Sequence, residues 1–521
     1  MSAPQRLMLL RDIAVGRQRE HGSELNEFSL SLDSGEAVVL LGESGSGKSA
    51  LMRLLCGDGS LGETVAGTVQ FGHASPEPAA TLLLGCDRIA YWPDASMPLL
   101  SPHAPALAQF VRIVSHKTRT SLETARAEFA LALERFSGAP PLATFALSPA
   151  AIGTGLLAWG LLAAALAQSP EILVADQPLA QLSPAAARAL IDAVMAEQKR
   201  LGFGLLYAAT RPDIAKWLGA RVVVLKQGRV VEEGSVARLA GEQSHAYTRT
   251  FFRPTTRDGA QPRGQGRGEP VLQVYGLELK RKGDKQKREP LTFALHRSAT
   301  LALIGDDGSG RRALVRTLAG LQRPQAGRIV FDSVDIGILT QTMLSRLRRR
   351  LAMITGDDAV LDPRLTVADT VEEPLRAPLN LSRELLAAYR DTALKRVGLS
   401  SLPVDRAVKH LSSFDNRRLQ IARAIAAAPL LVIADEPWRG LEAPAQNAIQ
   451  DLLRDFRSQE GPAFLTVTAD FAVAQALADE ALVLENGRVV ERGAIADLLR
   501  APQEEATRRL VRAALPERLG G

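Results

Sequence analysis

One segment near the start of the chain has the residue types and spacing of a phosphate-binding loop. Residues 42–49 read GESGSGKS and match the pattern G-x-x-x-x-G-K-[ST]. Glycines allow backbone N–H groups to converge on a phosphate where a helix begins. In this pattern the lysine, Lys48, reaches the β- and γ-phosphates of a nucleotide, and the hydroxyl of Ser49 ligates Mg²⁺. The candidate nucleotide-binding residues of this first loop are Gly42, Ser44, Gly45, Ser46, Gly47, Lys48 and Ser49.

A second segment, residues 305–312, reads GDDGSGRR and repeats the first loop without two of its functional groups. Arg311 keeps the positive charge of the lysine but not its compact shape. Arg312 places a cation where the Mg²⁺-ligating hydroxyl is expected. Mg²⁺ and this guanidinium ~4 Å apart would repel by at most roughly 8 kcal/mol at an effective dielectric of ~20. We therefore expect this loop to bind nucleotide weakly, without a proper metal ligand, or not at all. Its candidate nucleotide-binding residues are Gly305, Gly308, Gly310 and Arg311.

A carboxylate that could hold Mg²⁺ ends a second apolar run in each half of the chain. The first run, ILVADQP, places Asp176 at its end, followed by Gln177. The second run, LVIADEP, ends in Asp435, followed by Glu436. The residue after the aspartate normally carries the base that orients the attacking water, so Glu436 is a candidate base. Gln177 is nearly isosteric with glutamate but cannot accept a proton at neutral pH.

Positioning these groups requires buried strands that end beside one another. The runs 36–42 and 171–176 in the first half, and 299–305 and 430–435 in the second half, are typical of buried strands. A strand, a glycine-rich turn and then a helix predict an α/β fold with parallel sheets.

The motifs recur in the same order at an offset of about 260 residues, which indicates a tandem duplication. We predict a first domain over 1–252 and a second domain over 271–521. Residues 253–270 are rich in Gly, Pro, Arg and Gln and are typical of a flexible linker. An Arg/Gly-rich stretch can also bind RNA, but one this short is more often a tether.

Composition excludes several other classes of protein. The chain has 521 residues with 46% hydrophobic residues and a net charge of +6, which permits contact with anionic surfaces but does not require nucleic acid. Its two cysteines exclude a disulfide framework. The apolar run 152–167 is shorter than the ~20 residues of a membrane span and favours a buried helix. The first residues lack the apolar core of a signal peptide, so we expect a protein of the cytoplasm.

The order of the motifs resembles that of ABC-transporter ATPase domains in both halves. Between the two phosphate-binding motifs of each half lies ALSPAA or HLSSFDNRRLQIARA, and GRVVEEG or GRVVERG follows. The segment SHAYTRTFF, residues 244–252, resembles a segment of the oligopeptide, dipeptide and nickel importer ATPases. Residues 504–516 resemble a degenerate copy of the same segment. The chain thus resembles the fused two-domain ATPase subunits of that importer group, with degenerate motifs.

The resemblance implies two P-loop NTPase domains of the ABC type, each with a mostly parallel sheet core, an antiparallel β portion and a helical subdomain. It implies ATP and Mg²⁺ as cofactors, with Ser49 and Asp176 as the metal ligands. It also implies intramolecular head-to-tail pairing, in which Ser412 of the signature LSSFD would be lent to the first site. Family members carry a switch histidine where this chain has Thr210 or Ala469, and a Q-loop glutamine near Asp94 or Gly356.

Neither composite site is complete, since the first lacks a base at Gln177 and the second lacks a proper phosphate loop. We expect Mg–ATP binding at the first loop with slow or absent hydrolysis. The resemblance implies permease subunits and an extracytoplasmic solute-binding protein as partners. It also implies a peripheral position on the inner face of the cell membrane and a peptide or other small solute as cargo.

Two alternatives differ from this importer hypothesis. The chain could be a pseudo-ATPase, an ATP-dependent scaffold or regulator that does not drive transport. It could also act on ribosomes or DNA, but such ABC proteins typically keep intact signatures and carry a long charged arm. We therefore expect no nucleic-acid partner.

Overall fold

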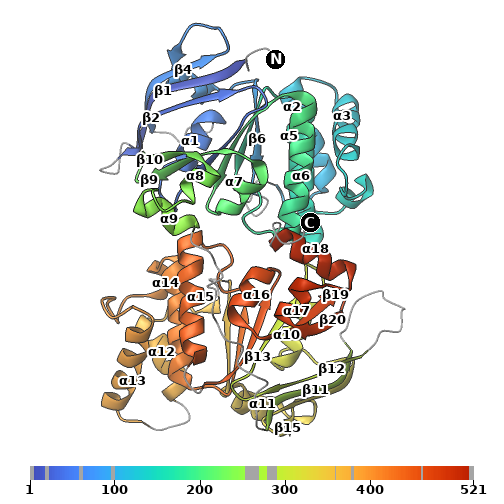
Figure 1. The fold of residues 1–521 in the computed structure, drawn as a ribbon, viewed down its shortest axis with the longest axis vertical. Helices are drawn as coiled ribbons and strands as arrows, with labels where there is room; N and C mark the ends of the chain where they lie inside the picture. Colours follow the sequence, from blue (N-terminus) through green and yellow to red (C-terminus); the bar gives the residue numbers. More distant parts are fainter. Residues whose placement is uncertain are drawn as a thin grey trace. The chain divides into compact units, whose positions relative to one another are not determined.

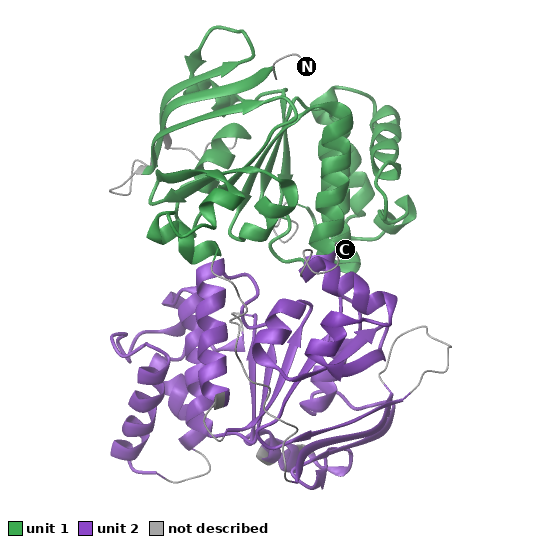
Figure 2. Cartoon of the chain, viewed as in Figure 1, with its two compact units in different colours: residues 1–182, 186–253 green, residues 183–185, 254–521 purple. Residues whose placement is uncertain are grey.

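The computed structural model describes residues 5–17, 23–57, 63–94, 100–252, 269–278, 290–357, 360–376, 381–458 and 461–514. The chain divides into two compact units, residues 1–182 with 186–253 and residues 183–185 with 254–521 (Figure 2). Most of the predicted linker, residues 253–270, lies outside the described residues.

The described residues of the first unit form a larger and a smaller sheet (Figure 1). The larger sheet has the strand order β10-β9-β3-β8-β7-β6, and its described pairs are parallel except for β9 with β10. The smaller sheet is antiparallel, with the order β2-β1-β4-β5. The strands are β1 Arg6–Arg17, β2 Ser23–Asp33, β3 Ala37–Leu41, β4 Glu63–Phe71, β5 Glu77–Pro78, β6 Ile89–Pro93, β7 Ile172–Asp176, β8 Gly204–Ala209, β9 Arg221–Lys226 and β10 Arg229–Ser235.

Helices α2, α3 and α5 pack on one another and form the helical part of the first unit. The α-helices between residues 48 and 252 are α1 Lys48–Leu55, α2 Ala106–Thr118, α3 Leu122–Glu134, α4 Pro149–Ile152, α5 Thr154–Leu166, α6 Pro184–Leu201, α7 Pro212–Leu218, α8 Val236–Leu239 and α9 Ala246–Phe252. Short 3₁₀ helices are η1 Ala79–Leu84 and η2 Leu142–Ala146.

The second unit repeats this topology. Its larger sheet has the order β20-β19-β13-β18-β17-β16, and its smaller sheet has the order β12-β11-β14-β15. The strands are β11 Pro270–Glu278, β12 Leu291–His296, β13 Thr300–Ile304, β14 Ala326–Phe331, β15 Val334–Asp335, β16 Leu351–Thr355, β17 Leu431–Asp435, β18 Ala463–Thr468, β19 Glu480–Glu485 and β20 Arg488–Ala494.

Helices α12, α13 and α14 pack on one another and form the helical part of the second unit. The α-helices after residue 310 are α10 Arg311–Leu318, α11 Gln341–Arg348, α12 Val367–Arg376, α13 Arg383–Arg396, α14 Ser413–Ala427, α15 Ala443–Ser458, α16 Phe471–Leu477, α17 Ile495–Arg500 and α18 Glu505–Ala514. Short 3₁₀ helices are η3 Ile336–Ile338 and η5 Val408–His410. The predicted fold is confirmed, with a mostly parallel core, an antiparallel portion and a helical part in each unit.

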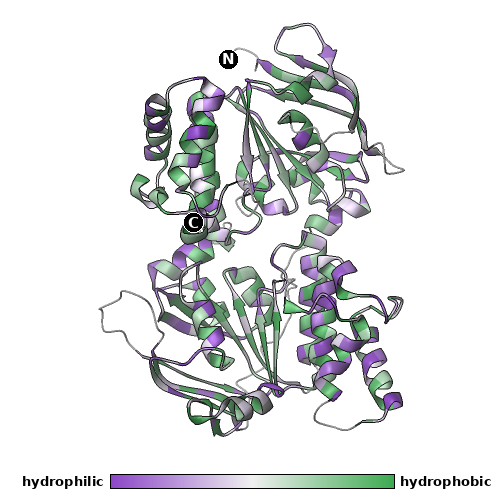
Figure 3. Cartoon of the chain, turned by 180° about the vertical axis from the view of Figure 1, so that it is seen from behind, coloured by the Kyte–Doolittle hydropathy of each residue, from purple (hydrophilic) through white to green (hydrophobic). Residues whose placement is uncertain are grey.

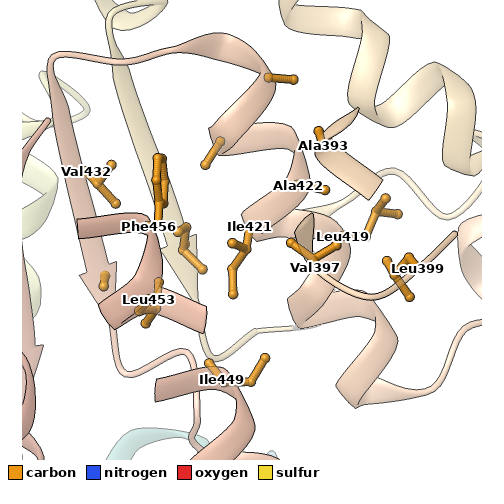
Figure 4. Packing of buried hydrophobic residues seen from close by; sticks show 14 of the residues in the cluster. Ala393, Val397, Leu399, Leu419, Ile421, Ala422, Val432, Ile449, Leu453 and Phe456 are labelled. Carbon is orange, nitrogen blue, oxygen red and sulfur yellow. The ribbon is translucent and has the colours of Figure 1, made fainter. Parts of the chain in front are cut away.

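The central strands are buried because their runs of Val, Leu, Ile and Ala face packed layers on both sides (Figure 3). In the second unit a further core joins α13, α14, α15 and β17 (Figure 4). Burial of each large aliphatic or aromatic side chain contributes about 1.5–3 kcal/mol. The labelled members of this core are Ala393, Val397, Leu399, Leu419, Ile421, Ala422, Val432, Ile449, Leu453 and Phe456.

The apolar run near residue 160 forms α5, as the buried-helix interpretation predicted. Every residue from Leu157 to Leu166 is buried. Of the helices that the structure describes, none is both long enough and apolar enough to cross a membrane.

Candidate functional site

The two phosphate-loop motifs adopt the same backbone conformation. Gly45 and Gly47 have φ values of 76° and 100°, and their counterparts Gly308 and Gly310 have 82° and 101°. These values lie in the left-handed region that favours glycine. Each second glycine caps a helix, α1 in the first unit and α10 in the second. The glycine skeleton therefore builds the same turn in both units, whatever side chains follow it.

The first glycine of each loop touches the carbonyl of a neighbouring strand. A Cβ atom at Gly42 would lie 2.5 Å from the oxygen of Leu225, and one at Gly305 would lie 2.5 Å from the oxygen of Leu484. Neither position can hold a side chain without a shift of backbone. Tertiary packing therefore requires glycine here in addition to the turns.

Lys48 is held inside its own loop. Its Nζ donates hydrogen bonds to the oxygens of Gly42 at 2.6 Å and Glu43 at 2.9 Å, and to Oγ of Ser46 at 3.0 Å. The residue is only 3% exposed. Ser49, one position later in the first turn of α1, is exposed. The loop thus keeps an ammonium group at its centre and a hydroxyl at its surface.

Asp176 ends β7, and β8 lies between β7 and β3, the strand that leads into the first loop. Helix α1 contacts β7 directly. Oδ1 of Asp176 is buried without a hydrogen-bond partner among the described residues. Burial raises the pKa of this carboxyl, and nearby Lys48 opposes the shift. A buried carboxylate oxygen that lacks a donor is suited to a cation, so Asp176 fits a Mg²⁺ ligand.

Gln177 and Glu436 occupy equivalent positions in the two units. Their φ values are 50° and 46°, both in the left-handed region. The N–H of Gln177 donates to the oxygen of Ala208 on β8 at 3.2 Å, and that of Glu436 donates to Val467 on β18 at 3.1 Å. The two units therefore present either an amide or a carboxylate from one backbone geometry.

Arg311 does not reproduce the contacts of Lys48. Its Nη1 lies 3.1 Å from Oε1 of Glu436, so the two side chains form an ion pair. The Arg311 side chain is only 7% exposed. Oγ of Ser309, the counterpart of the serine that Lys48 contacts, has no hydrogen-bond partner within the described part of the chain. The longer arginine thus reaches Glu436 in the next motif instead of bonding to Ser309 of its own loop.

A second arginine completes the cluster around Glu436. Arg439 Nη1 lies 3.2 Å from Oε2 of Glu436, and the N–H of Ala469 donates to Oε1 at 3.1 Å. Asp307 lies 3.9 Å from both Arg311 and Arg439. We define the Arg311 cluster as Asp307, Arg311, Glu436 and Arg439.

Burial alone would raise the pKa of Glu436, but Arg311 and Arg439 hold the pKa below its ordinary value. The carboxylate is therefore ionised and has a guanidinium on each oxygen. Burial and the neighbouring Glu436 raise the pKa of Asp435, against the effect of the arginines. The candidate base is engaged inside its own unit, and its catalytic role stays a prediction.

Strand register places Asp94 and Gly356 in equivalent positions. Pro93, the last residue of β6, pairs with Asp176, and Thr355, the last residue of β16, pairs with Asp435. Asp94 and Gly356 are therefore each the first residue after these strands. A Cβ atom at Gly356 would lie 2.6 Å from the backbone oxygen of Glu436. The second unit therefore has no space for a glutamine at this position without rearrangement.

The two signature-like motifs begin helices of very different length. Ser412 caps the 15-residue helix α14, and its Oγ accepts from the N–H of Asp415 at 3.1 Å. Its counterpart Ser148 precedes the four-residue helix α4 and makes no capping bond through its side chain within the described residues. The role of Ser412 at the first site stays a prediction.

Sequence reasoning missed two residues that the structure places at the loops. Arg439 follows Glu436 by three residues, so a turn after the aspartate–glutamate pair could have suggested it. Tyr247 of α9 contacts the backbone of the first loop, although 204 positions separate it from Glu43. No local pattern could have shown that contact.

Comparison with known proteins agrees with these motifs. The family model described as "ABC transporter" matches residues 25–180 and 289–439, which together make up more than half of the chain. The chain is 29% identical to the protein named "Uncharacterized ABC transporter ATP-binding protein YejF" of Escherichia coli (strain K12), over 97% of this chain and 99% of that protein. It is also 29% identical to the "Glutathione import ATP-binding protein GsiA" of Escherichia coli (strain K12), over 97% of this chain and 88% of that protein.

Among solved structures, the fold is similar to cbiO1 from Clostridium perfringens, described as part of the transporter complex cbiONQ. The match has a TM-score of 0.41 and 24% identity, and it covers 48% of this chain and 97% of that chain. The family model matches both halves, at the segments that carry the two phosphate loops and the strands ending in Asp176 and Asp435. The chain therefore belongs to the ABC transporter family.

Proposed function

We propose that this chain is the ATP-binding subunit of an importer that takes up peptides or another small solute. The similarity to a glutathione import ATP-binding protein over 97% of the chain supports this class of cargo. The permease subunits and an extracytoplasmic solute-binding protein would be separate chains. The protein would lie on the inner face of the cell membrane.

The single observation that carries the proposal is that the first unit contains both a loop lysine and a buried carboxylate oxygen without a donor. Lys48 is held at the centre of the loop by three acceptors, and Asp176 presents a buried oxygen with no donor among the described residues. A nucleotide would meet the backbone N–H groups between Gly45 and Ser49, together with the Lys48 ammonium. Mg²⁺ would neutralise phosphate charge beside Ser49 and Asp176.

Slow or absent hydrolysis follows from the residues at the two base positions. Gln177 can orient water but cannot take its proton. Glu436 can take a proton, but Arg311 and Arg439 hold its carboxylate in ion pairs. We propose that the second loop binds nucleotide weakly or not at all, because its arginine is committed to Glu436.

A second candidate function is a pseudo-ATPase that uses ATP as a structural ligand without driving transport. The Arg311 cluster favours this candidate, because it closes the second site with groups of the chain itself. Under either function, we propose head-to-tail pairing of domains 1–252 and 271–521 across a linker at 253–270.

Calorimetric titration of the purified chain with Mg–ATP tests the proposal. We expect saturable binding that weakens at least about tenfold in Lys48→Ala, since charge-assisted hydrogen bonds to phosphate are lost. The matched control is Arg312→Ala, which removes an exposed cation from the second loop and should leave binding unchanged. Binding that Lys48→Ala does not affect would contradict the assignment of the first loop.

Phosphate release measured with and without the permease partners separates the two candidate functions. Turnover that the partners stimulate supports the importer ATPase. Tight binding without stimulated turnover supports the pseudo-ATPase.

A further inference from the structure

Helix α9 reaches the first phosphate loop through one side chain. The N–H of Glu43, the second residue of the loop, donates to Oη of Tyr247 at 3.2 Å. The same hydroxyl donates to the backbone oxygen of Leu225 at 3.4 Å. That oxygen also lies against Gly42, where it would be 2.5 Å from an added Cβ atom. The Tyr247 hydroxyl thus connects the strand β9 to the start of the loop.

The Tyr247 ring is fixed on several sides. The residue is 8% exposed, and its ring meets Phe251 edge-on with centroids 5.2 Å apart. Nζ of Lys226 lies 4.7 Å from the ring centroid, a cation–π distance. A ring held in this way keeps its hydroxyl at one point, so the Glu43 N–H is held there as well.

Glu43 links this hydroxyl to the lysine of the loop. Its N–H bonds to Tyr247, and its carbonyl oxygen accepts from Nζ of Lys48 at 2.9 Å. The Tyr247 bond directs the Glu43 N–H toward α9 and fixes the orientation of this peptide at the start of the loop. A loop held in its binding geometry before the ligand arrives loses less freedom on binding.

In the second unit the corresponding helix, α18, contacts its loop through an ion pair and not through a tyrosine hydroxyl. Thr507 of α18 is wholly buried like Thr248 of α9, and this match places Ala506 where the first unit has Tyr247. Arg509 instead forms ion pairs with Asp306, the counterpart of Glu43, at 3.4 Å and with Glu485 at 3.2 Å. In that unit α18 contacts the loop through the exposed side chain of Arg509.

We infer that Tyr247 is a positioning residue for the nucleotide at the first loop, acting through the Glu43 peptide. The inference rests on the proposed function, because it needs a loop that binds Mg–ATP. It assigns to helix α9 a part in nucleotide affinity. Tyr247 bonds to the loop backbone, so we expect its effect on nucleotide binding and not on chemistry.

The test is Tyr247→Phe, which removes the hydroxyl and keeps the ring. We expect Mg–ATP to bind about five- to tenfold more weakly by calorimetry, the effect of one hydrogen bond. Amide hydrogen exchange by mass spectrometry should show faster exchange in the loop peptide and not in β3. The matched control is Thr250→Val, which removes an exposed hydroxyl whose bond goes to the Tyr247 carbonyl at 2.7 Å and not to the loop.

The outcomes separate this inference from the proposed function. If the wild-type chain and Lys48→Ala both fail to bind Mg–ATP, the proposed function fails and the inference fails with it. If wild type binds and Tyr247→Phe binds equally well with unchanged exchange, only the inference is overturned. If Thr250→Val weakens binding as much as Tyr247→Phe, the effect comes from α9 packing and the inference is also overturned.

Discussion

The Arg311 guanidinium lies 3.1 Å from the Glu436 carboxylate, and both side chains belong to the second unit. In the first unit the corresponding residues, Lys48 and Gln177, form no such ion pair because Gln177 carries no charge. The lysine instead bonds to its own loop. One loop thus holds its cation among its own acceptors, and the other commits its cation to a carboxylate of the next motif.

Replacement of Glu436 tests how much this ion pair stabilises the second unit. Glu436→Gln leaves the buried Arg311 with only the more distant carboxylate of Asp307, at 3.9 Å, so we expect a loss of about 2–4 kcal/mol in the free energy of unfolding. Denaturant unfolding followed by circular dichroism measures it. The control is Asp497→Asn, since the ion pair of Asp497 with Arg500 is exposed and should contribute less than about 1 kcal/mol.

The pH dependence of unfolding gives a second measure of Glu436. Its pKa is lowered in the folded chain, so its stabilisation is present above the unfolded pKa of about 4.3 and is lost as the pH falls through the folded pKa. We expect wild type to lose stability in this acidic range more steeply than Glu436→Gln. Parallel stability curves for the two proteins would contradict the ion-pair assignment.

Restoring the lysine and serine should reopen the second loop. In Arg311→Lys combined with Arg312→Ser, the lysine can reach the loop carbonyls and Ser309, because the two loops share one backbone conformation. Calorimetry should then detect a second molecule of Mg–ATP per chain. Arg312→Ser alone is the control and should not add a site, since Arg311 still pairs with Glu436. An unchanged stoichiometry in the double variant would show that more than this cluster blocks the loop.

A base at position 177 should raise turnover. Gln177→Glu supplies the missing proton acceptor at the first site, and general-base catalysis is worth roughly 10²–10⁴-fold. We expect steady-state phosphate release to increase at least about tenfold. Glu436→Gln should not change the rate, because that carboxylate lies in the other unit. A stronger effect of Glu436→Gln than of Gln177→Glu would reverse the assignment of the two sites.

Loss of the buried carboxylate should separate metal binding from stability. Asp176→Asn should make nucleotide binding insensitive to Mg²⁺. It should also stabilise the nucleotide-free chain by about 1 kcal/mol, because a neutral amide costs less free energy to bury without a partner than a carboxylate does. Calorimetry with and without EDTA and thermal unfolding measure the two effects. The control Asp94→Asn removes a nearby charge and should keep the Mg²⁺ dependence. A Mg²⁺ dependence that survives in Asp176→Asn would exclude Asp176 as the ligand.

Local pattern was sufficient for the elements that carry the candidate sites. The glycine spacing predicted the loops, and Gly45, Gly47, Gly308 and Gly310 adopt the left-handed conformations that such turns need. The run of apolar residues near Leu162 predicted a buried helix, which is confirmed. The predicted α/β fold and the family are confirmed as well.

Side-chain partners could not be predicted in the same way. The sequence showed that Arg311 replaces the lysine of the second loop and that Glu436 is kept as a candidate base, but it did not show that these two side chains form an ion pair. The sequence also did not show that a side chain at position 356 would clash, because the atom that it would meet is the backbone oxygen of Glu436.

By itself the sequence determined the duplication, the strand–loop–helix order and the identity of each group at the two loops. These follow from local spacing, since turns, caps and buried strands depend on neighbours along the chain. Only the tertiary structure decided where Arg311 and Tyr247 point. Their partners lie 125 and 204 positions away, and the folded sheet brings them within hydrogen-bond distance. Arg311 pairs with the nearest opposite charge, and the Tyr247 hydroxyl pairs with the nearest donor. Strand order, and not distance along the sequence, decides which group is nearest.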